Sequence, residues 1–129
     1  MRHITQTKFG SEEGNCFAAC IACLFPVEIE DVPDFYQQAQ SLWWDAFCLW
    51  MCEHFNVEPV ITGHYESIPD PSTPYLIGGK AERGLMHSVI GRNGKVIWDP
   101  HPSRAGLIDQ QDYTYFIENQ CVDPSELTS

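Results

Sequence analysis

The sequence lacks several features that would each point to a class of protein. It has no apolar run close to the ~18 residues that span a bilayer, and its first residues contain no apolar segment of the kind that directs secretion. Basic residues are also few: seven lysines and arginines stand against eighteen acidic residues, so the formal net charge is −11. We therefore expect a soluble, cytoplasmic protein, in the host cytoplasm if a phage encodes it, that binds neither membranes nor nucleic acid.

No Pro-, Gly- or Ser-rich linker divides the 129 residues, so we expect a single domain over residues 1–129 with one core. The chain nevertheless has six cysteines. Because no secretion signal accompanies them, we expect thiols rather than a disulfide framework.

Two groups of cysteines have spacings that deserve comparison with metal sites. Cys16, Cys20 and Cys23 have the spacing of some iron–sulfur enzymes, but the same i, i+4, i+7 spacing marks the core face of a helix, which we favour. Cys48 and Cys52 could form a zinc site with Cys20 or Cys23, although no loop-borne C-x-x-C motif supports it. We therefore predict no metal and no cofactor.

Residue patterns predict helices followed by strands. A helix is expected from Cys16 to Phe25 with Asn15 as its N-cap, and a second from Ser41 to Phe55, whose aromatic stripe with His54 we interpret as core packing. Expected strands are Val57–Thr62, Tyr75–Gly79, Leu85–Ile90, Lys95–Trp98 and Tyr113–Ile117, with a loop at Gly63–Pro74 and a polar tail at Val122–Ser129. The fold class is therefore α+β, with N-terminal helices packed on an antiparallel sheet of four to five strands.

One hairpin is predicted with particular clarity, because Asn93-Gly94 lies between two β-branched runs. Such a turn places His87, near the start of one strand, beside Asp99, which ends the other strand before Pro100. The carboxylate could then hold one ring nitrogen and leave the other free to face a third group.

Cys16 is a candidate for that third group. A thiol becomes a nucleophile when its pKa is lowered, and both a helix N-terminus and an imidazolium lower it. Gly14 and Asn15 make a tight entry into the predicted helix, so Cys16 is expected in its first turn.

The segments Gln6 to Cys20 and His87 to Pro100 resemble the papain-like cysteine peptidase superfamily, most closely the thiol peptidases that process bacteriocin leader peptides. The Gln-Thr-x-Phe-Gly and Gly-Asn-Cys-Phe opening is also similar to that of small phage and bacterial proteins. The resemblance implies a papain-like fold, with Cys16 as nucleophile, His87 as general base and Asp99 as its orienter. It implies Gln6 as oxyanion donor, although the stretch between Gln6 and Cys16 is longer than is usual in that superfamily.

Further residues are expected to contact substrate: Asn15, Phe17, His64, His101 and Arg104. His64 also competes with His87 as base, but it lies in a loop without a partner carboxylate. Arg104 follows a proline-stiffened loop and could bind a carboxylate or phosphate, or could simply offset nearby acidic residues.

These residues predict a thiol hydrolase, namely a peptidase, amidase or acyl transferase that acts on an amide, ester or isopeptide bond of a peptide, protein or small molecule. The alternative is a non-enzymatic protein on a papain-like scaffold, for example a phage-encoded inhibitor of a host factor.

Overall fold

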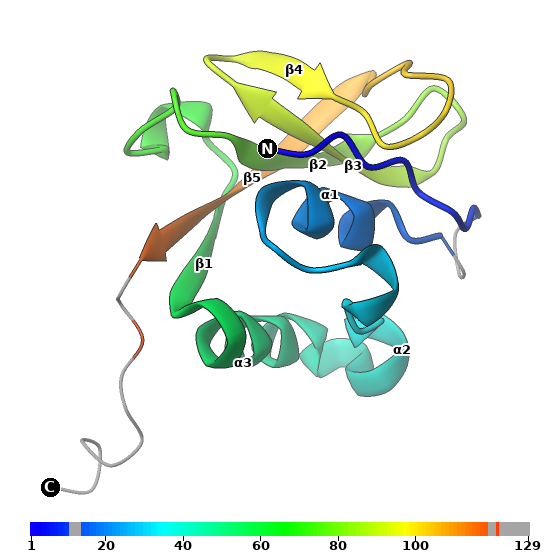
Figure 1. Cartoon of the computed structure of the whole chain (residues 1–129). Helices are drawn as coiled ribbons and strands as arrows, with labels where there is room; N and C mark the ends of the chain where they lie inside the picture. Colours follow the sequence, from blue (N-terminus) through cyan, green and yellow to red (C-terminus); the bar gives the residue numbers. More distant parts are fainter. Residues whose placement is uncertain (11–13, 119–120, 122–129) are drawn as a thin grey trace, which may run out of the picture. The chain divides into compact units, whose positions relative to one another are not determined.

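The computed structural model describes residues 1–10, 14–118 and 121 of the chain. Helices come first and strands follow, so the chain is α+β, as predicted (Figure 1). The helical elements are α1 (Cys16–Leu24), η1 (Ile29–Asp31), α2 (Phe35–Ala39), η2 (Gln40–Leu42), α3 (Trp43–Phe55) and η3 (Tyr65–Ser67), where η marks a short 3₁₀ turn. The strands are β1 (Val57–Thr62), β2 (Tyr75–Lys80), β3 (Met86–Arg92), β4 (Lys95–Trp98) and β5 (Asp109–Glu118). The polar tail predicted for residues 122–129 lies outside the described residues.

Contacts group the elements into two compact units. The sheet unit comprises residues 1–34 and 61–115, and the helix unit comprises residues 35–60 with the described residues from 116 onward. All the candidate site residues named from the sequence belong to the sheet unit. That the chain forms a single domain stays a prediction.

The sheet has five strands in the order β1-β5-β2-β3-β4, which confirms the predicted antiparallel sheet. The predicted hairpin is confirmed as β3 and β4, joined by Asn93 and Gly94 with φ of +53° and +80°. Positive φ at both residues is the geometry that Asn-Gly favours in a tight hairpin turn. On its other side β3 pairs with β2, and this pairing sets Gly79 opposite His87.

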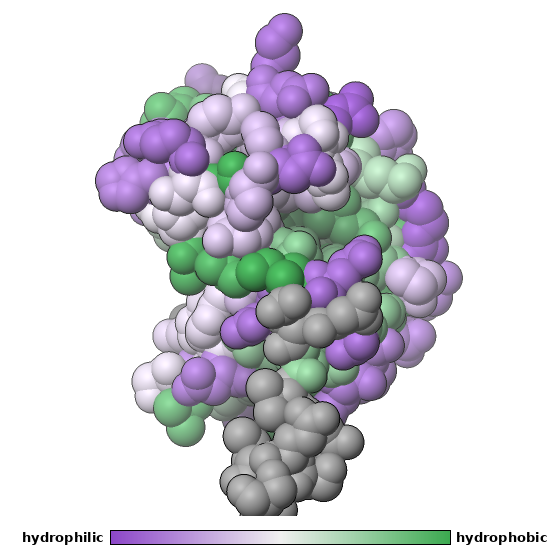
Figure 2. All heavy atoms as spheres, turned by 90° about the vertical axis from the view of Figure 1, so that its left-hand side faces the viewer, coloured by the Kyte–Doolittle hydropathy of each residue, from purple (hydrophilic) through white to green (hydrophobic). Residues whose placement is uncertain are grey.

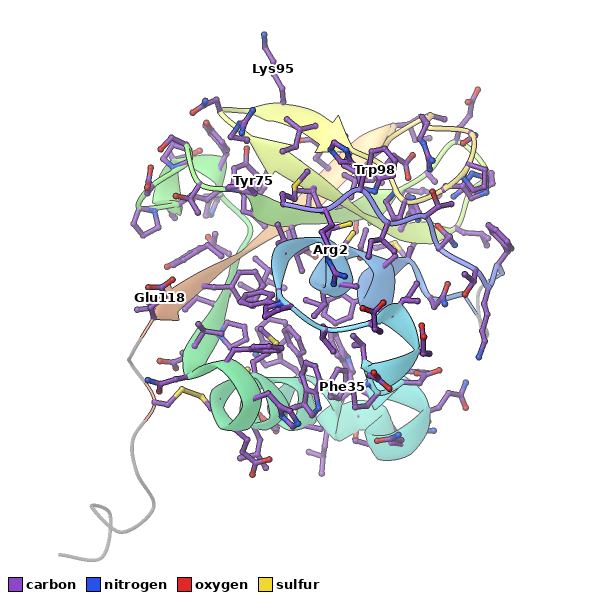
Figure 3. The ribbon with its side chains drawn as sticks, in the orientation of Figure 1. Arg2, Phe35, Tyr75, Lys95, Trp98 and Glu118 are labelled. Carbon is purple, nitrogen blue, oxygen red and sulfur yellow. A yellow bond between two sulfur atoms is a disulfide. The ribbon has the colours of Figure 1, made fainter. Side chains whose placement is uncertain are left out.

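The two ends of the β3–β4 hairpin differ in polarity. Residues 92–96 at the turn are exposed, and Figure 2 shows mainly hydrophilic side chains at the top of the molecule, where the turn lies. Lys95 extends away from the sheet there (Figure 3). At the opposite end, His87, Asp99 and Pro100 are buried. Because buried ionisable groups require partners, this end of the hairpin is where a site is expected.

Helix α1 packs on β3. Residues Ala18 to Cys23 are buried without interruption, as is typical of a helix covered on all sides. The Cys20 thiol donates to the carbonyl oxygen of Ser88 on β3 at 3.5 Å. Near the helix C-terminus the Arg2 guanidinium donates to the carbonyl oxygens of Ala22, Phe25 and Val27. Carbonyl groups in the last turn lack partners within the helix, so Arg2 ties the N-terminal segment to α1.

In the helix unit, α3 buries Phe47 and Met51, and Phe35 of α2 packs against Phe47 with ring centroids 5.4 Å apart. The predicted aromatic stripe is therefore partly core. His54 is exposed and stacks on Trp50 with centroids 4.6 Å apart. Among the described residues, no helix has both the length and the apolar character needed to cross a membrane.

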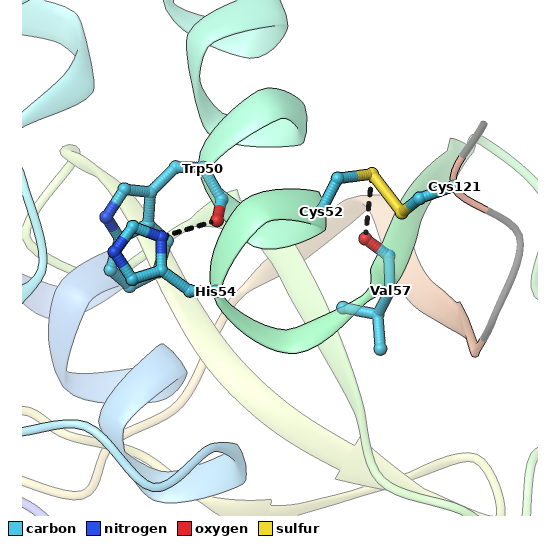
Figure 4. The surroundings of a disulfide bond; sticks show 5 residues. All are labelled: Trp50, Cys52, His54, Val57 and Cys121. Carbon is cyan, nitrogen blue, oxygen red and sulfur yellow. Dashed lines mark hydrogen bonds between the residues drawn. A yellow bond between two sulfur atoms is a disulfide. The ribbon is translucent and has the colours of Figure 1, made fainter. Parts of the chain in front are cut away.

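The expectation that every cysteine is a thiol is wrong for two of them. Cys52 at the end of α3 forms a disulfide with Cys121, and its Sγ lies 3.3 Å from the carbonyl oxygen of Val57 (Figure 4). The disulfide also removes Cys52 from the zinc site considered with Cys48. Disulfides are typical of oxidising compartments, so a cytoplasmic location stays a prediction.

Candidate active site

Asn15 and Cys16 lie where the N-terminal segment meets α1. Asn15 holds the N-cap position, but its side chain does not cap the helix, contrary to our expectation. Its Oδ1 instead accepts hydrogen bonds from the backbone N–H groups of Thr7 and Lys8, and its Nδ2 donates to the Thr7 hydroxyl at 2.8 Å. Asn15 therefore fixes the N-terminal segment beside the first turn of the helix, where the thiol of Cys16 lies.

His87 and Asp99 meet at the buried end of the β3–β4 hairpin. The distance between His87 Nε2 and Asp99 Oδ1 is 2.6 Å, and the two residues are 5% and 4% exposed. Asp99 accepts two further hydrogen bonds, from the backbone N–H of His101 to Oδ1 at 2.9 Å and from that of Gly106 to Oδ2 at 2.7 Å. The carboxylate is therefore held by its own strand end and by the loop that follows, and it fixes the orientation of the imidazole.

His87 also makes a hydrogen bond with Cys16. Because Nε2 is held by Asp99, Nδ1 is the ring nitrogen that remains for the thiol. The structure thus brings together three of the four residues predicted to be catalytic, one from the start of a helix and two from one hairpin.

The interactions of Cys16 favour its thiolate. Burial raises the pKa of the Cys16 thiol, but the hydrogen bond and charge of His87, with the backbone N–H groups of Ser88 and Phe17, outweigh burial and bring the pKa below its usual value. A thiol with a lowered pKa beside an imidazole is the arrangement of a reactive cysteine.

The interactions of His87 and Asp99 favour their charged forms as well. Burial lowers the pKa of His87, but its hydrogen bonds to Asp99 and Cys16 outweigh burial and raise it to about 9. Burial raises the pKa of Asp99, but the hydrogen bonds from His87, His101 and Gly106 outweigh it and lower the pKa. The interactions within the site therefore favour the charged form of each group: the thiolate of Cys16, the imidazolium of His87 and the carboxylate of Asp99.

Gln6 is buried between the two halves of this site. Its backbone N–H donates to the carbonyl oxygen of Pro100 at 2.9 Å. Its side-chain Nε2 donates to the carbonyl oxygen of Lys8, which also accepts the backbone N–H of Asn15. Among the described residues, Gln6 Oε1 is a buried side-chain atom with no hydrogen-bond partner. The Gln6 amide thus lies beside the residue that precedes Cys16, but in this structure it donates to backbone, so its oxyanion role stays a prediction.

Gly10 and Gly14, which lie between Gln6 and Cys16, are hydrogen bonded to each other. The backbone N–H of Gly14 donates to the carbonyl oxygen of Gly10 at 3.1 Å. A Cβ at Gly14 would lie 2.5 Å from that oxygen, so this contact requires glycine.

The loop after Asp99 carries two predicted substrate contacts. The His101 ring lies edge-on to the His87 ring, with centroids 6.1 Å apart. The Arg104 guanidinium donates to the carbonyl oxygens of Asp99 and His101 and to the Thr5 hydroxyl. It also lies 4.1 Å from the centre of the Trp98 ring. These contacts give Arg104 a positioning role for the loop, and its contact with substrate stays a prediction.

The other two predicted substrate contacts lie in different surroundings. Phe17 follows Cys16 in α1 and is half-buried. His64 is exposed and lies 4.0 Å from Glu66. It precedes η3, where Tyr65 approaches Gly94 at the hairpin turn, the end of the sheet opposite His87. The choice of His87 over His64 as the candidate base is therefore favoured by position as well as by burial.

Sequence reasoning missed three residues at this site. Ser103 hydrogen bonds to the His101 ring, Gly106 donates to Asp99 with φ of +74°, and the exposed Phe9 packs against His101. The Pro-His-Pro-Ser run indicated a stiff loop, and the glycine indicated a turn, but neither pattern identifies the partner. No sequence signal linked Phe9 to a residue 92 positions away.

The remaining cysteines of α1 are occupied by backbone contacts. The Cys23 sulfur accepts the backbone N–H of Ile4 at 3.2 Å, and Cys20 contacts Ser88. Burial raises the pKa of both thiols. Within the described part of the chain, no group of three or more histidine, cysteine and acidic side chains could hold a metal ion.

Comparison of this chain with protein-family models, with curated proteins and with solved structures finds no match. Any assignment of function must therefore come from the geometry of the site itself.

Proposed function

We propose that the protein is a thiol hydrolase or acyl transferase with a papain-like fold, in which Cys16 is the nucleophile, His87 the general acid and base, and Asp99 its orienter. The observation that carries the proposal is the buried His87–Asp99 pair, 2.6 Å apart, whose imidazole also hydrogen bonds to a cysteine in the first turn of α1. Cysteine, histidine and carboxylate acting in series are the arrangement that activates a thiol for attack on a carbonyl carbon.

In the first half of the reaction, the Cys16 thiolate attacks the carbonyl carbon of an amide, ester or isopeptide bond. The carbonyl oxygen becomes an oxyanion, for which the backbone N–H of Cys16 and the amide of Gln6 are the candidate donors. His87 then gives its proton to the leaving amine or alkoxide, and the acyl group remains on Cys16 as a thioester. Asp99 stabilises the imidazolium while it is charged.

In the second half, water or an amine attacks the thioester and gives its proton to His87, and the C–S bond breaks. Water makes the protein a hydrolase, and an amine makes it a transferase. The net charge of −11 favours neutral or cationic substrates over nucleic acid. A peptide, a protein or a small amide or ester is the substrate class we propose, with the cytoplasm as the location.

One observation favours the alternative of a non-enzymatic binding protein. The Gln6 amide nitrogen is engaged by the carbonyl oxygen of Lys8 and would have to change partner to stabilise an oxyanion. A scaffold that has lost catalysis would retain the thiol–imidazole contact without a working oxyanion donor. The two functions differ in whether Cys16 reacts as a thiolate.

The test is alkylation of the native protein with iodoacetamide from pH 5 to pH 9, with each modified cysteine identified by mass spectrometry. Cys48 is an internal control, because burial and the charges of Asp45 and Glu58 raise the pKa of its thiol. We expect Cys16 to react at pH 6 at least about tenfold faster than Cys48, since each unit of pKa changes the thiolate fraction tenfold.

Two variants complete this test. His87→Ala should remove the advantage of Cys16, whereas His54→Ala, which changes an exposed histidine of the helix unit, should keep it. If Cys16 in the wild-type protein reacts no faster than Cys48, the hydrolase proposal is wrong and the binding function takes its place.

A further inference from the structure

A second histidine lies against the first. The rings of His101 and His87 meet at 85° with centroids 6.1 Å apart, and the ring of Phe9 meets His101 at 81° and 5.5 Å. Phe9 is 49% exposed. His101 and Phe9 therefore extend the site from the His87 ring toward the surface, and neither has a part in the acid–base chemistry described above.

Contacts within the loop fix the protonation of the His101 ring. Its Nδ1 accepts the backbone N–H of Ser103 at 3.1 Å and lies 2.9 Å from the Ser103 hydroxyl oxygen. The Ser103 hydroxyl oxygen accepts a hydrogen bond from the backbone N–H of Ala105, and the Ser103 hydroxyl proton is donated to His101 Nδ1. Because Nδ1 is an acceptor, the proton of the neutral ring is on Nε2. Among the contacts of the described residues, this Nε2–H has no partner.

Burial and the positive charges around His101 favour the neutral form of its ring. Burial lowers the pKa of His101, and so do the positive charges of Arg83, His87 and Arg104, while Asp99 opposes them. The ring is therefore a hydrogen-bond donor at neutral pH and not a cation. The His101 ring lies beside the exposed ring of Phe9, and Arg104 contacts the backbone of His101. These surroundings suit a ligand that presents an oxygen acceptor attached to an apolar group.

We propose that His101 and Phe9 form the subsite for the amine side of the substrate, in which His101 Nε2–H donates to a carbonyl oxygen carried by the leaving or incoming amine. The inference rests on the proposed function, because leaving and incoming amines both exchange a proton with His87 and must lie beside its ring. It narrows the substrate class to amides whose amine component is an amino-acid residue.

The step in which this subsite acts is transfer from the acyl-enzyme. The nitrogen of the incoming amine attacks the thioester carbon, its proton passes to His87, the C–S bond breaks, and the electron pair of that bond leaves on Cys16 as thiolate. His101 holds the carbonyl group of the amine and does not exchange a proton.

The experiment measures selectivity between two amines. The 129-residue protein is acylated with 4-nitrophenyl acetate, and equal concentrations of glycinamide and propylamine compete for the acetyl group. The ratio of N-acetylglycinamide to N-propylacetamide is measured by mass spectrometry after subtraction of the uncatalysed reaction. Because the ratio compares two acceptors of one acyl-enzyme, slower acylation or partial unfolding of a variant does not change it.

Three variants are compared with the wild-type protein. His101→Phe keeps an aromatic ring and removes the donor, and we expect the ratio to fall about threefold to tenfold, the worth of one hydrogen bond. His101→Gln keeps an N–H donor and should retain more of the selectivity. His54→Phe, an equivalent change at a histidine that also contacts backbone and an aromatic ring, should leave the ratio unchanged.

The possible results separate the two proposals. If wild-type protein forms an acyl-enzyme on Cys16 and the ratio in His101→Phe equals that in the wild type, the amine subsite is wrong while the hydrolase proposal stands. If no acetyl group is found on Cys16 under conditions where 4-nitrophenyl acetate is consumed by free thiols, both proposals are overturned.

Discussion

At the scale of single residues, the carboxylate of Asp99 joins His87 to the loop that follows β4. Its carboxylate accepts hydrogen bonds from the His87 ring, from the backbone of His101 and from that of Gly106. Two of these donors belong to the loop that also carries the proposed amine subsite. Replacing Asp99 therefore tests how much the charge of one carboxylate stabilises the site.

The Asp99–His87 pair should stabilise the protein over a defined pH range. The lowered pKa of Asp99 makes its contribution present above the usual carboxyl pKa of 3.8 and lost as the pH falls through the lowered value. The raised pKa of His87 makes its contribution complete below 6.5 and lost as the pH rises through about 9. Asp99→Asn should thus lower the free energy of unfolding by about 2–4 kcal/mol at pH 5.5 and by less at pH 10. Urea unfolding at the two pH values measures this difference.

Asp112→Asn is the matched control for that measurement. Burial raises the pKa of Asp112, and the backbone N–H of Gly78 only partly opposes it, so the charged form of this carboxyl is disfavoured. Asp112→Asn should therefore lower the free energy of unfolding only slightly, and by the same amount at pH 5.5 and at pH 10. If Asp99→Asn lowered the free energy of unfolding equally at both pH values, a charged Asp99–His87 pair would be contradicted.

At the scale of elements, the hairpin was predictable and the surroundings of Cys16 were only partly so. Asn-Gly specifies a turn through local backbone geometry, so residues 93–94 sufficed to place His87 beside Asp99. The role of Asn15 was not predictable, because its hydrogen bonds go to Thr7 and Lys8 in a segment that only the fold brings near. Helix α2 was also not predicted, since its five residues are too few to show a helical period.

The contacts that decide the roles of Gln6 and Arg104 join residues far apart in the sequence. Gln6 meets Pro100, and Arg104 meets Thr5. Gln6 was a candidate oxyanion donor through the resemblance, and Arg104 was a candidate substrate contact through its residue type and its loop. Whether a polar side chain faces substrate or backbone depends on tertiary packing, which no local pattern of residues contains.

Strand pairing beside the site makes a prediction at this scale. Gly79 on β2 faces His87 on β3, and a Cβ at Gly79 would lie 2.0 Å from the backbone carbonyl oxygen of Asp109 on β5. The backbone at Gly79 or Asp109 would have to move to make room for this Cβ. Gly79→Ala should therefore lower the free energy of unfolding by about 2–3 kcal/mol. Gly63→Ala is the control, since its Cβ would meet Gln111 at 3.9 Å, an ordinary contact. Equal melting temperatures for the two variants would refute the pairing of β2 with β5 at this register.

At the scale of the whole molecule, the disulfide links two cysteines that no pattern in the sequence pairs. Cys52 and Cys121 are 69 residues apart, and Cys121 stands alone in a polar stretch. Six cysteines allow many pairings, and spacing alone does not choose among them. The thiols of Cys16, Cys20, Cys23 and Cys48 remain free. The nucleophile proposed at Cys16 and a structural disulfide therefore occur in one chain.

Titration of thiols in denaturant tests this arrangement. Without reductant the unfolded wild-type protein should have four reactive thiols, and after reduction six. Cys48→Ser should lower both counts by one, whereas Cys121→Ser should give five thiols in either case. Because a disulfide that closes a long loop restricts the unfolded chain, Cys121→Ser should also lower the free energy of unfolding by about 2–4 kcal/mol under non-reducing conditions. Six thiols before reduction would mean that Cys52 and Cys121 are not joined, and the helix unit would then be stabilised by side-chain packing, such as that of Phe35 against Phe47, without a covalent link.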